Sequence, residues 1–526
     1  MAGGDSSLYD AIVVGGGHNG LVAAALLARA GRDVLMLERS DAVGGAAVSI
    51  SPFAGHDARL SRYSYLVSLF PQPLLDELGV NVELRVRSVS SYTPWGDAGI
   101  LVSDDTAASA ASIRRTLGSE GAVGELAAFG ALTGRLAART FGSLTEPLRS
   151  REAFAAVVDD DAMWHGVFEA PLAQLLERSF GDDLVRGIVA TDALIGTFAA
   201  LDDARLLQNR CFLYHVIGRG TGRWDVPVGG MGALTGELAR IAIEGGAELR
   251  TGSPVLAIDT DGRTAEVRTA DGRAHRARHV LAALSPTIVD DLAPGVLAPR
   301  PGDRAPEGAQ LKLNLLLARL PRLRDSDVRP EDAFAGTFHV NESAAQLGAA
   351  FAQATSGQIP ELPPCEAYCH SLTDPTILGP ELRAAGAQTL TVFGLHMPAR
   401  LFAADPSAAK REAVEKTLRS INSVLAEPIE ECLLDDAHGE PCLEARTPVE
   451  LEDELAMPGG HIFHRDLSWP FAEADREIGG WGVETAVDNV WLAGAGARRG
   501  GGVSGIPGFG AARAVLAADT GRVRTD

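Results

Sequence analysis

Three glycines near the start of the chain have the spacing of a dinucleotide-binding turn. Gly15, Gly17 and Gly20 form a GxGxxG directly after the apolar run 11–14, and an Ala-rich helical stretch follows. In such a strand–turn–helix unit, the first glycine permits the tight turn and the second lets the backbone approach a pyrophosphate. The third lets the helix pack close to the strand. The pyrophosphate then lies at the helix N-terminus, where free N–H groups and the positive dipole end favour anions.

A carboxylate and a glycine pair follow this turn. Glu38 ends a second apolar run at 34–37, 18 positions after Gly20. A carboxylate there can accept hydrogen bonds from ribose hydroxyls, and it would repel the 2′-phosphate of NADP. The glycine pair extends the loop, which suits a ligand that continues past its ADP half and favours FAD over NAD. A ligand-free glycine-rich turn is the alternative, because the chain has 59 glycines. The residues expected to contact the cofactor here are Gly15, Gly17, Gly20, Glu38, Arg39, Gly44, Gly45 and Ala46.

The cysteines and histidines do not form a metal or redox motif. Cys365, Cys369 and His370 give a CxxxCH without a second ligand pair nearby, and His461 and His464 lie in strand or loop surroundings. The chain has no CxxC, which a disulfide reductase would need for its dithiol. Its five cysteines are scattered and odd in number, so no disulfide framework is expected. We therefore expect no bound metal.

Charge and hydropathy limit the classes of partner. The net charge of −22 argues against nucleic acid or an anionic membrane surface as a partner. No apolar run approaches the roughly 20 residues that span a bilayer. The first residues, MAGGDSSLYD, have the pattern of neither a signal nor a transit peptide, so a cytoplasmic location is expected. Peripheral contact with a membrane and the oligomeric state stay open.

The length and the order of elements predict two joined domains. A chain of 526 residues exceeds a single core, and its cofactor-binding features lie at the start, near 227–285, and at the end. We expect an α/β fold in which a Rossmann-like (GR2-type) FAD-binding domain is interrupted by an α+β substrate domain. The FAD-binding domain is expected at 1–60, 220–300 and 480–526, and the substrate-binding, helical domain at 61–219 and 301–479. Within these, the patterns predict helices in 104–150, 169–215 and 405–425, strands at 255–258, 264–269 and 276–285, and a half-buried strand at 310–317.

Several blocks together resemble the FAD-dependent superfamily of phytoene desaturases and amine oxidases. The GxGxxG with its acid, PVGGMGAL (227–234) and LAGAGARRGGGVSGIPG (492–508) all have counterparts there. ATDALIG (190–196), YHVIG (214–218) and GGHIFHRDLS (459–468) look more like the phytoene-dehydrogenase-like branch. That branch includes carotene ketolases and the mitochondrial pyridine nucleotide–disulphide oxidoreductase-domain protein.

The resemblance implies that FAD lies along the first strand–helix–strand unit. Val255 would contact the adenine through its backbone, and Gly494, Gly505, Ile506 and Pro507 would lie along the flavin and the ribityl chain. A helix beginning near Pro507 would aim its N-terminus at the isoalloxazine and stabilise negative charge there. Two departures stand out. Ala46 replaces the common Arg or Thr, and His56-Asp57-Ala58-Arg59 replaces an Asp-x-Gly-Pro element, so a phytoene substrate does not transfer directly.

Lys312 and His215 are the candidates for chemistry. The chain has three lysines against 44 arginines, so a lysine kept on the strand QLKLNLLL suggests that a compact, tunable ammonium is needed. The strand resembles the one in amine oxidases whose lysine reaches the flavin N5 through water. The alternative is a strand lysine that extends its ammonium to solvent. His215 is expected in the substrate cavity, with a hydrogen-bonded core imidazole as its alternative.

Three functions are compatible with these residues. The first is an FAD-dependent desaturase, dehydrogenase or ketolase-like enzyme that moves hydride from an apolar carotenoid or isoprenoid substrate to flavin. The second is a flavin amine oxidase, which needs an aromatic cage for which the final glycine segment offers only Phe509. The third is a binding protein like the Rab GDP-dissociation inhibitors. The electron acceptor (quinone, oxygen or another protein) stays open.

Overall fold

The first of two large sheets is built from strands that are distant in the sequence. The computed structural model describes residues 8–67, 69–222, 224–298 and 304–520. A seven-stranded sheet has the order β10-β11-β12-β1-β2-β9, with β18 also paired to β12. The central strand β1 runs parallel to both neighbours, β2 and β12. The strands are β1 (Leu8–Val14), β2 (Val34–Leu37), β9 (Glu248–Arg250), β10 (Val255–Thr260), β11 (Ala265–Thr269), β12 (Ala274–Ala282) and β18 (Val490–Leu492).

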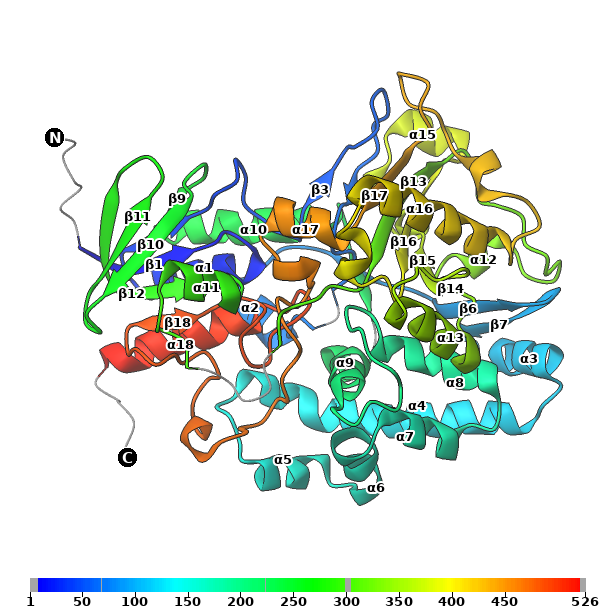
Figure 1. The fold of residues 1–526 in the computed structure, drawn as a ribbon, viewed down its shortest axis with the longest axis horizontal. Coiled ribbons are helices and arrows are strands. Elements are labelled where there is room, and N and C mark those ends of the chain that lie inside the picture. Colours follow the sequence, from blue (N-terminus) through cyan, green and yellow to red (C-terminus); the bar gives the residue numbers. More distant parts are fainter. Residues whose placement is uncertain (1–7, 68, 223, 299–303, 521–526) are drawn as a thin grey trace.

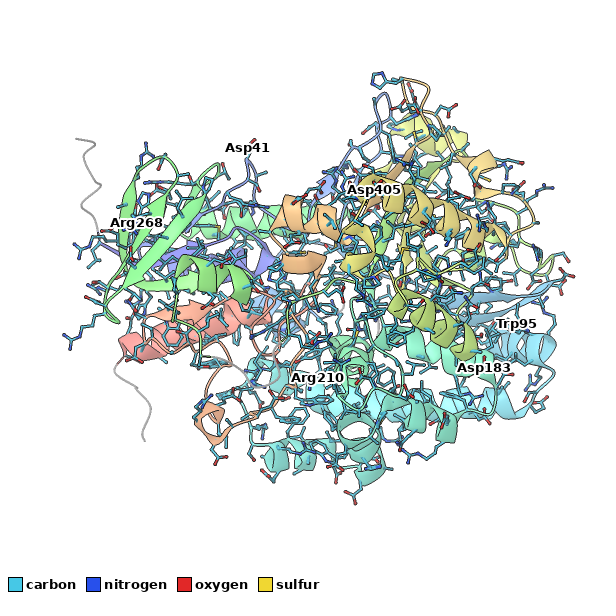
Figure 2. All side chains as sticks on the ribbon, in the orientation of Figure 1. Asp41, Trp95, Asp183, Arg210, Arg268 and Asp405 are labelled. Atoms are coloured by element: carbon cyan, nitrogen blue, oxygen red, sulfur yellow. The ribbon has the colours of Figure 1, made fainter. Side chains whose placement is uncertain are left out.

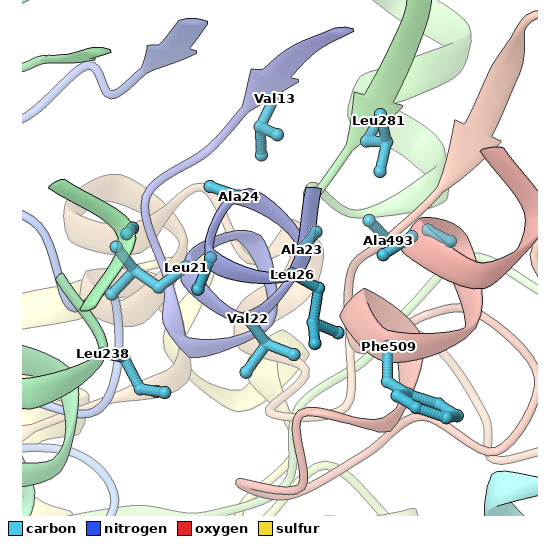
Figure 3. Packing of buried hydrophobic residues seen from close by; sticks show 14 of the residues in the cluster. Val13, Leu21, Val22, Ala23, Ala24, Leu26, Leu238, Leu281, Ala493 and Phe509 are labelled. Atoms are coloured by element: carbon cyan, nitrogen blue, oxygen red, sulfur yellow. The ribbon is translucent and has the colours of Figure 1, made fainter. Parts of the chain in front are cut away.

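Three helices pack together against this sheet. Helix α1 (His18–Arg29) contacts both α10 (Met231–Glu244) and α18 (Ile506–Asp519). Its alanines bring these neighbours close, and Figure 3 shows α1 between Leu238 of α10 and Phe509 of α18. Because the side chains of this interface are almost fully buried, each large one contributes about 1.5–3 kcal/mol to the core. The phosphate-binding turn before α1 is therefore held on a rigid base.

The second sheet belongs to the expected substrate domain. Its order is β17-β13-β16-β15-β14-β6-β7, and helix α16 (Pro406–Asn422) packs on β13 and β15. The predicted half-burial of 310–317 is wrong. All residues of β13 are buried, because the strand lies between β16 and β17 with both faces covered. The strands are β6 (Val89–Trp95), β7 (Ala98–Ser103), β13 (Leu311–Leu317), β14 (Thr337–Val340), β15 (Cys365–Tyr368), β16 (Gln388–Gly394) and β17 (Leu443–Arg446).

A helical layer lies below the second sheet in Figure 1 and has its own apolar core. Arg268 on β11 and Trp95 at the end of β6 stand at opposite ends of the molecule (Figure 2), with the helices and both sheets between them. The α/β class is confirmed, and so are the helices expected in 104–150 and 405–425. The stretch 169–215 is helical only in part, because 194–206 is turn and loop. The layer contains α3 (Thr106–Leu117), α4 (Gly121–Thr140), α5 (Arg151–Val158), α6 (Asp161–Trp164), α7 (Leu172–Ser179), α8 (Asp183–Ala190) and α9 (Leu207–Val216).

Shorter elements connect these layers. Among the described residues, no helix is both long and apolar enough to cross a membrane. The remaining strands are β3 (Ser49–Ile50), β4 (Leu60–Ser61), β5 (Leu84–Val86) and β8 (Asp225–Pro227). The remaining α-helices are α2 (Gln72–Leu78), α11 (Pro286–Leu292), α12 (Pro330–Ala333), α13 (Ala344–Thr355), α14 (His370–Thr373), α15 (Pro380–Ala385) and α17 (Pro448–Leu455).

Candidate cofactor and substrate site

One continuous cavity of about 510 Å³ brings together most of the residues singled out in the sequence. Its walls come from the first sheet, the second sheet and the helical layer. The cavity therefore lies where a cofactor held by one part of the chain can meet a substrate held by another. The expected site residues that line it are Gly15, Gly17, Gly20, Glu38, Arg39, Gly45, Ala46, His215, Val255, Lys312 and Gly494.

The glycine turn has the geometry that its spacing predicts. Gly15 has φ of +100°, and a Cβ there would lie 2.8 Å from the carbonyl oxygen of Ala283. A Cβ on Gly20 would overlap the carbonyl oxygen of Gly15. Gly17 differs, because the nearest atom to a Cβ there would be the Gly45 Cα at 4.0 Å. Gly17 also caps α1 without a side chain, so its backbone and the helix N-terminus are free to receive a pyrophosphate.

The Glu38 carboxylate is fixed by backbone donors. One oxygen accepts a hydrogen bond from the Gly16 N–H at 2.7 Å and the other from the Ser40 N–H at 2.8 Å. Each oxygen keeps a further lone pair, so the carboxylate is oriented and still able to accept from ribose hydroxyls. The oriented Glu38 carboxylate and the open Gly17 cradle fit the ADP half of FAD.

Arg39 lines the cavity, and its guanidinium is hydrogen bonded to the backbone of α17. Its guanidinium donates to the carbonyl oxygens of Glu454 at 2.6 Å and Asp453 at 3.3 Å, near the end of α17. Tyr63 donates to the Glu454 carboxylate at 2.6 Å in the same region. Arg39 therefore ties α17 to the loop that follows β2.

The C-terminal glycine block lines the cavity only in part through the residues expected. Gly494 lines the cavity, and a Cβ there would overlap the Leu284 carbonyl oxygen, so backbone packs tightly behind it. Residues 501–503 also line the cavity, whereas Gly505, Ile506 and Pro507 do not. A Cβ on Gly505 would meet the Phe70 ring, and Ile506 packs in the helical core. The contact of Gly505–Pro507 with the flavin stays a prediction.

Gly44 also lies just outside the cavity lining. It has φ of +126°, and its N–H donates to the Gly16 carbonyl oxygen at 2.8 Å. This bond, together with the bridge between Gly17 and Gly44, joins the two glycine loops. Gly44 therefore positions Gly45 and Ala46, which do line the cavity.

Lys312 is buried, so the alternative of a strand lysine that extends its ammonium to solvent is wrong. Its side chain donates to the carbonyl oxygens of Tyr63 at 2.7 Å and Ser61 at 2.9 Å. The ammonium also lies 5.2 Å from the centre of the Phe393 ring. Burial lowers the pKa of Lys312 well below its ordinary value. The cavity therefore contains a lysine whose charge is tuned by its surroundings.

His215 presents a neutral imidazole to the cavity. Its Nδ1 donates to the Cys211 carbonyl oxygen at 2.8 Å, one turn earlier in α9, so Nε2 is the unprotonated acceptor. Burial lowers its pKa to about 4. The ring stacks on Trp224 with centroids 5.2 Å apart. The two alternatives for His215 therefore both apply: its imidazole is hydrogen bonded to the backbone, and it also lines the cavity.

An aromatic wall, which we define as Tyr65, Trp224 and Phe393, lines the cavity beside Lys312. The Tyr65 ring centre lies 4.5 Å from that of Phe393 and 6.4 Å from that of Trp224. Phe509, to which the sequence had pointed, packs against Trp481 instead. These rings come from three distant segments, so only the tertiary fold brings them together.

Two further histidines, His18 and His464, line the cavity, and the sequence did not predict that they would lie together there. His18 follows Gly17 in the glycine turn, and His464 lies in the HIFH segment. Burial lowers the pKa of each to about 4, and repulsion from His464 lowers that of His18 further. His18 Nε2 and His464 Nδ1 are buried without a hydrogen-bond partner. These polar atoms beside the glycine loops are suited to a polar group of a bound ligand.

Most of the cavity lining away from Glu38 is apolar. Among the described residues, the only carboxylates that line the cavity are Glu38 and Glu454, and both lie near Arg39. An uncharged substrate surface therefore has complementary walls. The apolar and aromatic lining includes Leu66, Leu69, Ile195, Tyr214, Trp224, Phe393, Ile462, Phe463 and Leu467.

Two family models match the chain. Residues 13–76 match the NAD(P)-binding Rossmann-like domain, and residues 73–424 match the flavin containing amine oxidoreductase family. The second match spans more than half of the chain and includes Lys312, His215 and two residues of the aromatic wall, Trp224 and Phe393.

Relatives match over nearly the full length. An uncharacterized protein of Mycobacterium tuberculosis is 48% identical over 97% of both chains. The pyridine nucleotide-disulfide oxidoreductase domain-containing protein 2 of Mus musculus is 28% identical over 97% of this chain and 93% of its own. Hydroxyneurosporene desaturase of Cereibacter sphaeroides is 27% identical over 56% of this chain and 59% of its own. In fold, the chain is similar to cyclohexylamine oxidase from Brevibacterium oxydans, with a TM-score of 0.60, 16% identity, and 98% and 100% of the two chains covered.

Proposed function

Because the chain belongs to the flavin-containing amine oxidoreductase family and uses FAD, we propose that it is an oxidoreductase that takes hydride from an apolar, carotenoid- or isoprenoid-like substrate. The observation that carries the proposal is the apolar lining of the cavity around Lys312 and His215. The partial similarity to a desaturase that acts on hydroxyneurosporene supports the same class of substrate.

The chain's own residues provide binding, orientation and exclusion of water. FAD, when bound, supplies a two-electron acceptor for hydride. Gly17 and the start of α1 would receive its pyrophosphate, and Glu38 would fix its adenosine ribose. The aromatic wall and Leu467 would hold an apolar chain in one orientation and keep water out.

Removal of a second hydrogen as a proton needs an acceptor. His215 Nε2 is unprotonated, and His215 lines the cavity. Since its pKa is about 4, we expect His215 to pass on a proton rather than to retain it. Lys312 would act by its position, because its ammonium is held against the backbone beside the aromatic wall.

Amine oxidation is the second candidate, and the aromatic wall favours it. Aromatic faces attract a cationic or partly charged amine. Against this stands the lining near Lys312, in which none of the described residues carries a carboxylate that could pair with an ammonium substrate. We therefore rank the apolar substrate first.

Anaerobic reduction of the bound flavin separates the candidates. The FAD-loaded protein is mixed with carotenoids, isoprenoid alcohols, fatty acyl compounds and primary amines, and the flavin absorbance is followed. We expect bleaching by a carotenoid or isoprenoid compound and none by amines. Bleaching by amines alone would establish the second candidate. A stable flavin with every donor would support the binding-protein alternative.

A further inference from the structure

Behind the aromatic wall, three buried side chains converge in the second sheet. His339, Glu342 and Glu366 each place one nitrogen or oxygen atom within 4.8 Å of the others. Their exposed fractions are 6%, 1% and 1%. None of them lines the cavity described above, so this cluster, the His339 cluster, needs a separate explanation.

The sheet register brings two of the side chains together. His339 of β14 is directly paired with Glu366 of the antiparallel strand β15. Directly paired residues of neighbouring strands project from the same face with their Cβ atoms about 5 Å apart. The imidazole and the carboxylate are therefore neighbours because of the backbone.

A turn in the backbone adds the third side chain. Asn341 follows β14 with φ of +54°, which is uncommon for a residue other than glycine. Its side-chain amide donates to the Oγ atoms of Ser420 and Ser423, both at 2.9 Å, which fixes the turn. The next residue, Glu342, is thereby directed back to His339, and the two side chains are hydrogen bonded.

The His339 cluster lacks enough internal partners for its charges. One oxygen of Glu342 is bonded to His339 Nδ1, whereas the other is buried without a partner. Glu366 accepts from the Tyr368 hydroxyl. A buried carboxylate oxygen without a donor is costly unless a proton or a cation compensates it.

Other ionisable side chains surround the cluster. Glu366 and Asp192 both repel a negative charge on Glu342, and Arg87 interacts electrostatically with Glu366 and His339. A cation held between the two glutamates would offset the repulsion between them.

We propose that His339, Glu342 and Glu366 bind one divalent transition-metal ion, Zn²⁺ or Mn²⁺, as a structural site of the second sheet. An imidazole with carboxylate oxygens is a donor set that these ions accept, and the hard ions Mg²⁺ and Ca²⁺ prefer oxygen donors alone. The ion would join β14, its following turn and β15. Because the site is enclosed, the ion would enter as the chain folds.

The test is the metal content of the full-length, FAD-loaded protein. The chain is produced in medium supplemented with Zn²⁺ or with Mn²⁺, freed of loosely bound ions by gel filtration with a chelator, and analysed by mass spectrometry of the elements. We expect about one ion per chain in one of the two preparations. Glu342→Gln, which is close in size, should lower the metal content by about tenfold or more. Glu381→Gln on exposed α15 is the matched control and should retain the ion.

Electron paramagnetic resonance of the Mn²⁺ preparation gives a second measurement that needs no variant. Bound Mn²⁺ should lack the sharp signal of the hydrated ion. A folded wild-type protein with less than about a tenth of an equivalent of either metal would overturn the proposal, and a proton shared by His339 and Glu342 would then explain the cluster. Metal that persists unchanged in a folded Glu342→Gln protein would overturn it as well.

Discussion

The Lys312 ammonium donates a hydrogen bond to the Tyr63 carbonyl oxygen at 2.7 Å. This contact joins β13 of the second sheet to the segment that lines the cavity next to Ala46. The same segment carries Tyr65, whose ring forms part of the aromatic wall. One buried side chain therefore couples the packing of the second sheet to the shape of the cavity.

Replacement of Lys312 by Met should damage both stability and activity. The change keeps the length of the side chain but leaves the Ser61 and Tyr63 carbonyl oxygens without their donor, at a cost of about 1–3 kcal/mol. Displacement of the aromatic wall should slow flavin reduction by about tenfold or more. Thermal unfolding and anaerobic stopped-flow absorbance measure the two effects. Lys410→Met, which removes a half-buried ion pair with Glu450 outside the cavity lining, is the control. Equal rates in both variants would refute a role of Lys312 at the flavin.

Changing Gly17 or Gly20 to Ala should affect different properties. Gly17→Ala should weaken FAD binding, and Gly20→Ala should lower the stability of the fold. A methyl group on Gly17 meets no atom closer than 4.0 Å, so Gly17→Ala should fold normally. That methyl group would occupy the surface that receives the pyrophosphate, and we expect about tenfold weaker FAD binding, or about 1.4 kcal/mol. Gly20→Ala would overlap the Gly15 carbonyl oxygen and should lower the melting temperature of the apoprotein. Fluorescence titration with FAD and thermal unfolding of apoprotein separate the outcomes; unchanged FAD affinity in Gly17→Ala would contradict the assignment.

The part of the site that the sequence predicted is local in the chain. The turn at Gly15–Gly20 and the acid at Glu38 belong to one strand–helix–strand unit, whose elements are set by neighbouring residues. Their geometry could therefore be expected from spacing alone.

The remainder depends on pairings between distant segments. The order of the second sheet joins strands from β6 to β17, and the alternation in 310–317 could not show that both faces of β13 are covered. Tyr65, Trp224 and Phe393 meet only through this packing, as do His339 and Glu366 through their register. No single stretch of sequence contains those relationships.

Glu38 and Arg39 are adjacent but should affect FAD differently. Glu38→Gln replaces one of the two carboxylate oxygens by an amide N–H₂, so either the Gly16 or the Ser40 N–H loses its acceptor. The change also removes the charge expected to face the ribose. We expect FAD affinity to fall by about tenfold. Arg39→Ala removes only contacts to the carbonyl oxygens of 453–454, so its effect on FAD affinity should be smaller. Equilibrium dialysis of FAD tests the order, and a larger loss in Arg39→Ala would show that the guanidinium contacts the cofactor directly.

His215 should make the protein less stable in acid. Burial lowers its pKa from 6.5 to about 4, so between these values the unfolded chain binds more protons than the folded one. The free energy of unfolding therefore rises with pH across this window, and the contribution of His215 is complete above pH 6.5 and is lost as the pH falls to about 4. His215→Gln removes the titrating group, so it should reduce the difference in unfolding free energy between pH 5 and pH 7. His438→Gln, at an exposed position, should leave that difference unchanged. Urea unfolding at both pH values measures it, and an unaltered pH dependence in His215→Gln would show that the imidazole titrates as in the unfolded chain.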